Sequence, residues 1–196
     1  MPSSSIKFLL NDELITLNDL DTNTTVLEYL RNYKNLKGTK EGCASGDCGA
    51  CTAVLAEVKD NKLKYKSINT CITLLYTLHS KQLLTVEHIN SKYLHPVQQS
   101  MVDNDGAQCG FCTPGFVMSM YAMHKNKIKS TNENINKYLS GNLCRCTGYR
   151  PIKDALKNLK KYKNLNTDSS EILKKLKKVN LNDVILNKNN SKFFIH

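Results

Sequence analysis

The sequence contains no apolar run of about 18 residues or more, the length that an α-helix needs to cross a bilayer. The first residues, Met1 to Ile6, also lack the basic start and the apolar core of a secretory signal peptide. These two absences predict a protein that does not attach to membranes and that stays in the cytoplasm. Thiols remain reduced there, so we expect the cysteines of this chain to be free to bind metal.

Arginine is scarce as well. The chain carries 28 Lys and Arg residues against 17 Asp and Glu, a net charge of +11, yet only Arg31, Arg145 and Arg150 are arginines. A positive charge of this size is typical of nucleic-acid-binding proteins when the basic residues gather on one surface near aromatic side chains. Here the lysines are spread along the chain, so we expect no nucleic-acid partner.

Cysteine, by contrast, is abundant, with eight in 196 residues, a length that fits one domain or two small ones. Four residues separate Cys43 from Cys48, two separate Cys48 from Cys51, and Cys71 follows. This is the plant-type ferredoxin spacing, in which four thiolates hold a [2Fe–2S] cluster.

The residues around these cysteines are small. Gly42, Gly46 and Gly49 allow the backbone to approach the sulfurs closely and to turn its N–H groups toward their negative charge. Structural zinc more often uses two C-x2-C knuckles, and disulfides are disfavoured because the cysteines are crowded and no secretion signal is present. The spacing therefore favours a [2Fe–2S] cluster over zinc or disulfides.

Strand-like runs surround this loop. A hairpin is expected around Asn11-Asp12, a second pair of strands around Asp60-Asn61, and a helix capped by Thr24-Thr25 over residues 26–33. The strands are expected at residues 5–10, 13–17, 52–58, 63–68, 71–75 and 83–86. Together these elements predict a small mixed sheet crossed by one helix, with the cysteine loop at its edge.

From about residue 90 onward the pattern becomes helical. Helices are expected at residues 96–103, 113–125 and 131–141, and from Pro151 onward, because proline and threonine stand at their starts. Short helices joined by tight loops favour a bundle. Cys109 and Cys112 precede the second helix, and Cys144 and Cys146 lie between the third and fourth.

These four cysteines allow two interpretations when taken alone. Two loops between helices can bring them together around one metal ion or one cluster, although a C-x-C pair is tight for zinc. Beside a plant-type loop, a second iron–sulfur cluster uses all eight cysteines, four and four.

Three segments carry a resemblance to a known family: Lys40–Thr52, Gln108–Gly115 (QCGFCTPG) and Leu139–Ile152 (LSGNLCRCTGYRPI). They resemble the iron–sulfur part of the molybdenum hydroxylases, the xanthine dehydrogenase and aldehyde oxidase family, in order and spacing from about Ile6 to Tyr162. The resemblance implies an α+β chain: a β-grasp ferredoxin-like domain (1–89), an all-α four-helix [2Fe–2S]-binding domain (90–163) and a basic tail or linker (164–196).

The resemblance also implies roles for individual residues. Gln108 is expected to contact molybdopterin, and Cys146 to lie on the path from the pterin to the nearer cluster. No catalytic acid or base is expected in this chain. The implied ligands are Cys43, Cys48, Cys51 and Cys71 for one [2Fe–2S] cluster and Cys109, Cys112, Cys144 and Cys146 for the other.

In such enzymes electrons pass from molybdenum through both clusters to FAD and usually to NAD. We therefore expect a molybdenum-cofactor-binding large subunit and an FAD-binding subunit or domain, either as partners or as a missing part of the chain. The motifs resemble those of xanthine dehydrogenases more than those of the small subunits of aldehyde, carbon monoxide or aromatic-acyl hydroxylases. The small subunit of a related aldehyde or N-heterocycle hydroxylase is the first alternative. A free-standing ferredoxin-like carrier and a zinc-stabilised interaction module are the other hypotheses.

Past Tyr162 the resemblance fades. Residues 164–170 are polar and linker-like, and residues 171–179 predict a short basic helix before another polar stretch. Phe193-Phe194-Ile195 resembles the aromatic-rich strand through which fused relatives enter their flavin-binding domain. The alternatives for this tail are a solvated surface or a segment that docks on a partner.

Overall fold

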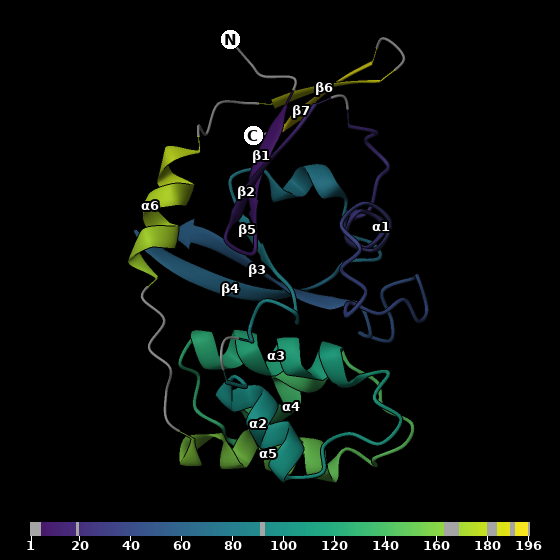
Figure 1. The fold of residues 1–196 in the computed structure, drawn as a ribbon, viewed down its shortest axis with the longest axis vertical. Coiled ribbons are helices and arrows are strands. Elements are labelled where there is room, and N and C mark those ends of the chain that lie inside the picture. The colour runs from purple at the N-terminus through teal and green to yellow at the C-terminus, as the bar shows by residue number, and fades with distance from the viewer. Residues whose placement is uncertain are drawn as a thin grey trace.

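A computed structural model of the chain describes residues 5–18, 20–90, 93–162 and 169–179, and, in backbone only, 184–188 and 191–195. A five-stranded sheet occupies the first half and helices occupy the second. Figure 1 shows the two parts stacked, with helix α3 (Thr113–Lys125) lying against the sheet. Beyond α3 lie α2 (Pro96–Asp103), α4 (Asn132–Leu139) and α5 (Arg150–Asn158). A ferredoxin-like sheet part followed by a helical part agrees with the predicted α+β class.

The sheet is mixed, as predicted, with the strand order β2-β1-β5-β3-β4. β1 and β5 run parallel, and the other neighbours are antiparallel. Its strands are β1 (Ile6–Leu10), β2 (Glu13–Leu17), β3 (Thr52–Lys59), β4 (Lys62–Asn69) and β5 (Gln82–Leu84). The turn between β3 and β4 puts both Asp60 (φ 51°) and Asn61 (φ 57°) in the left-handed region, as a tight hairpin turn requires.

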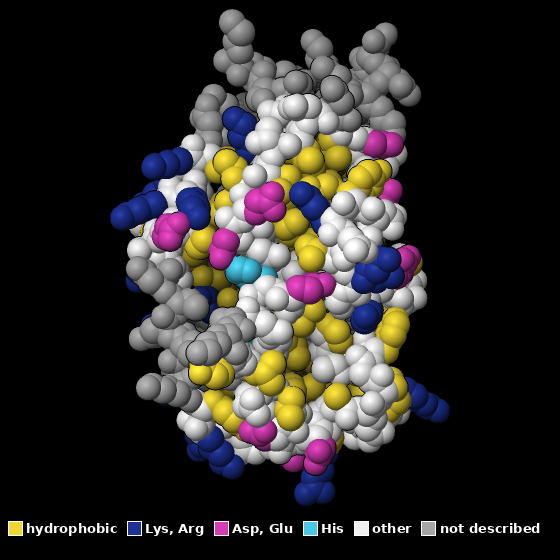
Figure 2. Space-filling view, viewed as in Figure 1, with side chains coloured by type: hydrophobic (Ala, Val, Ile, Leu, Met, Phe, Trp, Pro, Cys, Tyr) yellow, Lys and Arg dark blue, Asp and Glu magenta, His cyan; other side chains and the backbone are white. Residues whose placement is uncertain are grey.

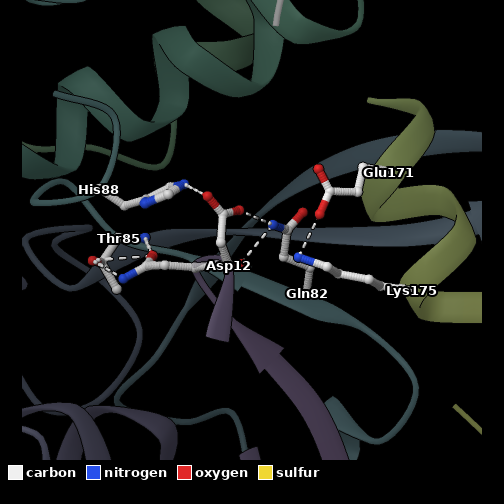
Figure 3. Close-up of polar contacts among 7 residues, drawn as sticks. Asp12, Gln82, Thr85, His88, Glu171 and Lys175 are labelled. Carbon is white, nitrogen blue, oxygen red and sulfur yellow. Dashed lines mark hydrogen bonds and ion pairs between the residues drawn. The ribbon is translucent and has the colours of Figure 1, made fainter. Parts of the chain in front are cut away.

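Polar contacts tie the first hairpin to the rest of the sheet. Figure 3 shows Asp12 between His88, whose Nε2 lies 3.4 Å from the carboxylate, and Gln82, whose Nε2 donates to Asp12 Oδ1 at 3.4 Å. Helix α6 (Ser170–Lys178) lies beside this turn and carries the Glu171–Lys175 ion pair at 2.8 Å. The basic helix predicted for the tail is therefore present as α6.

The helix predicted over residues 26–33 is present but not uniform. It begins as the single turn α1 (Val26–Glu28), where the Thr25 side chain accepts a hydrogen bond from Glu28 N–H at 3.1 Å. It then widens into the π-helical segment η1 (Tyr29–Tyr33), which stacks the rings of Tyr29 and Tyr33 at 6.0 Å.

The prediction of a strand over residues 71–75 is wrong. These residues form a turn that leads into the 3₁₀ helix η2 (Leu75–Leu78). Leu75 and Leu78 are both fully buried, and their spacing of three matches a helical turn rather than a strand. The hydroxyl of Thr73 donates to Asn69 O at 2.9 Å, which closes the turn at the end of β4.

The helices of the second half begin at or within one residue of the predicted starts. They are α2 (Pro96–Asp103), α3 (Thr113–Lys125), α4 (Asn132–Leu139), α5 (Arg150–Asn158) and the short 3₁₀ turn η3 (Leu159–Lys161). Every residue of α3 from Gly115 to Met123 is buried, because the sheet covers one side of the helix and its neighbours cover the other. This apolar core is therefore shared by the two parts of the chain, and a second buried cluster, which includes Phe8 and Leu30, lies within the first part.

In the tail, β6 (Val184–Lys188) pairs antiparallel with β7 (Ser191–Ile195), so Phe193-Phe194-Ile195 lies in a strand. The predicted linker lies mostly outside the described residues. Within them, no helix has the length and apolarity needed to cross a membrane. On the face shown in Figure 2, Lys and Arg side chains are scattered, with Asp and Glu among them.

Candidate functional site

The first cysteine loop turns backbone N–H groups toward sulfur. Cys43 Sγ accepts hydrogen bonds from the N–H groups of Ser45, Asp47 and Cys48 at 3.5, 3.2 and 3.3 Å. Cys43 N–H in turn donates to Cys48 Sγ at 3.4 Å. Hydrogen bonds from Ser45 and then Cys48 lower the pKa of the Cys43 thiol to about 6, so the loop stabilises a thiolate.

Glycine is required where the loop is tightest. A Cβ on Gly42 would lie 2.8 Å from Cys48 Sγ, inside van der Waals contact. Gly46 has a φ of +86°, and a Cβ there would lie 2.7 Å from the side chain of Ile72, the residue after Cys71. The glycines expected to admit the backbone to the sulfurs therefore do so at these two positions.

Cys71 completes the first group. Its thiol shares a hydrogen bond with Cys51, and burial followed by that contact raises the pKa of Cys71 to about 12. Two further hydrogen bonds hold the end of β4 against the loop, from Asn69 Nδ2 to Gly46 O at 2.5 Å and from Thr70 Oγ1 to Cys51 O at 2.8 Å. Cys43 pairs with Cys48 and Cys51 pairs with Cys71.

The second group comes from the loops before α3 and α5. Burial raises the pKa of Cys112 to about 12, and a hydrogen bond with Cys144 adds to the shift. Cys146 shares a hydrogen bond with Cys109, which raises the pKa of Cys146. The second group thus also consists of two pairs, Cys112 with Cys144 and Cys109 with Cys146.

Side chains, not only backbone groups, shape this second group. Cys144 Sγ lies 3.1 Å from the Thr147 hydroxyl, and Cys144 N–H donates to the Tyr149 hydroxyl at 3.1 Å. Tyr149 has a φ of +67°, which turns the chain sharply just before α5 begins. Sequence reasoning did not single out Thr147 and Tyr149, although both stand in the C-R-C-T-G-Y run.

Gln108 and Cys146, expected to face a molybdenum cofactor, are both exposed. Gln108 lies on the loop between α2 and α3, directly before Cys109, which is exposed as well. Their side chains are therefore accessible to a group outside this chain.

All eight cysteines are free thiols, so the disulfide alternative is wrong. In the part of the chain that the structure describes, no three His, Cys, Asp or Glu side chains gather closely enough to hold a single metal ion. Within each group hydrogen bonds join the cysteines two by two, and electrostatic interactions link the two pairs, Cys71 with Cys43 and Cys112 with Cys109. Each iron of a [2Fe–2S] cluster takes two thiolates, so these donors fit two such clusters.

Comparison with protein families supports this fit. Residues 8–76 match the model of a 2Fe-2S iron-sulfur cluster binding domain, and residues 85–157 match that of a [2Fe-2S] binding domain. The chain thus carries two [2Fe–2S]-binding domains.

Among curated proteins, the chain is 48% identical to mouse xanthine dehydrogenase/oxidase over 148 residues, which are 74% of the chain and 11% of that protein. It is 48% identical to Emericella nidulans xanthine dehydrogenase over 154 residues, 77% and 11% of the two lengths. A probable aldehyde oxidase of Caenorhabditis elegans is 44% identical over 159 residues, 80% and 13%. The chain therefore spans only about an eighth or less of these relatives.

Solved structures of related oxidoreductases are similar to this chain as well. The aldehyde oxidoreductase of Desulfovibrio gigas is similar at a TM-score of 0.69 and 31% identity, over 79% of this chain and 16% of that one. Quinoline 2-oxidoreductase of Pseudomonas putida 86 is similar at 0.67 and 29%, over 79% of this chain and 90% of that chain. The chain belongs to the xanthine dehydrogenase and aldehyde oxidase family and corresponds to the iron–sulfur region of these oxidoreductases.

Proposed function

We propose that this chain is the electron-transfer component of a xanthine dehydrogenase-like molybdenum hydroxylase. It would pass electrons from a molybdopterin centre to FAD and NAD during hydroxylation of xanthine or hypoxanthine. The observation that carries the proposal is the gathering of eight free thiols into two groups, each made of two pairs. Identity of 48% to xanthine dehydrogenases supports the purine substrate.

Each group would hold one [2Fe–2S] cluster, which supplies a one-electron carrier when bound. The ligands would be Cys43, Cys48, Cys51 and Cys71 in the first site and Cys109, Cys112, Cys144 and Cys146 in the second. This chain's own contribution is to hold the thiolates and to stabilise their charge. In the first site backbone N–H groups would do so. In the second the Thr147 hydroxyl would do so, together with the N-terminus of α3, where Cys112 occupies the N-cap position.

Gln108 would contact the molybdopterin, and Cys146 would be the ligand on the path from the pterin. Both side chains are exposed, which such a contact requires. Phe111 and Leu143, beside the second group, are 49% and 54% exposed. Large apolar side chains at this position favour a docked molybdenum-binding partner over a free-standing carrier.

The finer domain description is part of the proposal. Residues 1–89 would form the β-grasp domain, and residues 90–163, with α2 to α5, the four-helix domain. Residues 164–196 would be a linker toward an FAD-binding domain. The molybdenum and flavin parts would lie on partner subunits or on a further part of the chain, in the cytoplasm.

A metal analysis of anaerobically purified chain tests the cluster assignment. Two clusters require four irons and four labile sulfides per chain. Zinc in place of iron would contradict the proposal, and so would iron sufficient for a single cluster.

The substrate needs a separate test because a related aldehyde or N-heterocycle hydroxylase is the second candidate. It is favoured by 44% identity to a probable aldehyde oxidase and by the structural similarity to quinoline 2-oxidoreductase. Cells that produce the tagged chain should yield a co-purifying molybdenum protein. Reduction of the complex by xanthine but not by benzaldehyde or quinoline supports the purine assignment, and the reverse preference contradicts it.

A further inference from the structure

The two cysteine groups are joined by a backbone hydrogen bond. Leu143 N–H donates to the carbonyl oxygen of Cys48 at 2.9 Å. Cys48 belongs to the first group, and Leu143 directly precedes Cys144 of the second. This hydrogen bond therefore links a cysteine of the first group to the residue directly before a cysteine of the second.

Asn142, the residue before Leu143, is buried, with 4% of its surface exposed. Its side chain forms hydrogen bonds beside the Leu143–Cys48 contact. Its Nδ2 donates to Gly49 O at 3.0 Å and to Thr52 Oγ1 at 3.1 Å. Gly49 directly follows Cys48, and Thr52 directly follows Cys51. Its Oδ1 accepts from Ser119 Oγ of α3 at 2.6 Å. Every polar atom of the amide is engaged, and a satisfied buried network of this kind holds a single geometry.

The backbone segments around Asn142 are packed so closely that they leave no space for a side chain at two glycines. A Cβ on Gly49, whose φ is +70°, would lie 2.2 Å from Gly141 O. A Cβ on Gly115 of α3 would lie 2.2 Å from Gly49 O. The first loop, α3 and the 141–143 segment therefore pack backbone against backbone.

A second asparagine joins the two halves at the other end of α3. Asn126 Nδ2 donates to Tyr65 O at 2.7 Å, and Tyr65 N–H donates to Asn126 Oδ1 at 3.2 Å. This pair of hydrogen bonds also joins the sheet to the helical part. It lies at the C-terminus of α3, whereas the loop with Cys109 and Cys112 precedes the N-terminus of α3. Asn126 is thus a matched control for a contact that joins the halves without touching the cysteine loops.

We propose that Asn142 is a positioning residue that maintains the Leu143–Cys48 hydrogen bond and so fixes the separation of the two cysteine groups. The proposal rests on the proposed two-cluster function, because electron tunnelling weakens steeply with separation. Asn142 itself would ligate nothing; it acts by holding the segment 141–143 on the first loop.

The test compares Asn142→Ala and Ser119→Ala with Asn126→Ala in the full chain. Hydrogen exchange of the Leu143 amide, followed by mass spectrometry, reads the contact without any need for clusters. We expect Asn142→Ala to accelerate this exchange about tenfold, Ser119→Ala to accelerate it less, and Asn126→Ala to leave it unchanged. The exchange of the Tyr65 amide should show the opposite pattern.

The spin–spin splitting in the EPR spectrum of the reduced chain is the second readout, since it depends on the inverse cube of the separation. Asn142→Ala should change or broaden the splitting while iron content stays at the parent level, and Asn126→Ala should keep the parent spectrum. If Asn142→Ala does not fold, Ser119→Ala, which keeps both amide donors, carries the same test.

Unchanged exchange at Leu143 in the Asn142 and Ser119 variants would overturn the proposal, as would an equal change in Asn126→Ala. Failure of the proposed function looks different. In that case the parent chain itself lacks paired cluster signals, whereas the exchange measurement still reports on Asn142.

Discussion

The two cysteine groups stabilise sulfur by different means. In the first, N–H groups of a glycine-rich loop converge on Cys43, and the loop is largely exposed. In the second, the Thr147 hydroxyl lies 3.1 Å from Sγ of the buried Cys144. Backbone hydrogen bonds from Thr147 and Cys146 also act to lower the pKa of Cys144. One chain thus builds two thiolate sites of the same composition, one largely from converging backbone N–H groups and one in which a side-chain hydroxyl adds to backbone groups. This difference predicts that substitutions act differently in the two sites.

The largest effect is expected from removing a ligand. Cys146→Ser should abolish the second cluster and leave the first, so iron per chain falls to about half and one set of EPR signals disappears. Turnover with an acceptor that draws electrons from the later centres should stop. Cys43→Ser is the counterpart for the first site. Normal spectra in Cys146→Ser would contradict the ligand assignment.

Replacing two glycines by alanine distinguishes the energetic cost of a steric clash from the cost of a left-handed backbone conformation. Gly49→Ala must place a Cβ at a distance of 2.2 Å from Gly141 O at a φ of +70°, so we expect a loss of about 3 kcal/mol or more in the free energy of unfolding. Gly148 has a φ of +65° but nothing near its Cβ position. Gly148→Ala should cost only about 1 kcal/mol. Equal losses in urea denaturation would show that the first loop is not tightly packed on the helices.

Acid should weaken the helical half through His95, a side chain with 5% exposure that accepts a hydrogen bond from Val97 N–H at the start of α2. Burial, then the charges of His124 and Lys125, lower the pKa of His95 to about 4. The unfolded chain takes up this proton near pH 6.5 and the folded chain does not, so stability is complete above pH 6.5 and decreases toward pH 4.

The expected loss between pH 7 and pH 5 is about 2 kcal/mol. His95→Asn keeps a side chain that can cap α2 and does not titrate. Its unfolding free energy should therefore fall less over the same interval. If urea denaturation gives the same pH dependence for parent and variant, His95 is not the group responsible.

The smallest effect is expected from a single side-chain contact in the second site. Thr147→Val keeps the shape but removes the hydroxyl 3.1 Å from Cys144 Sγ. Loss of this hydrogen bond disfavours the more negative, reduced state, so the potential of the second cluster should fall by roughly 40 mV, about 1 kcal/mol. A redox titration should show an unchanged first cluster. A shift in both potentials would mean that the two sites are not electrostatically separate.

Local patterns in the sequence predicted much of the fold and of the candidate site. Cysteine spacing indicated the first group, whereas the second needed the position of its cysteines at helix ends and the family resemblance. Proline marked the start of α3 and threonine that of α4, because caps act within one turn. The 71–75 run was misassigned because a short apolar segment suits a strand and a 3₁₀ turn equally. The left-handed Tyr149 carries no sequence signal of its own.

The contacts of Asn142 lay beyond sequence reasoning for another reason. Gly49 and Thr52 are 93 and 90 residues away along the chain, and no periodicity relates residues at such separations. The packing of α3 on the sheet, which brings them together, depends on the whole shared core.

EPR spectroscopy of the dithionite-reduced chain tests the central claim most directly. Two [2Fe–2S] sites of different construction predict two distinct rhombic signals of equal intensity that interact magnetically because the groups are held together. One signal, or two that show no interaction, would contradict the account of two cysteine groups fixed side by side.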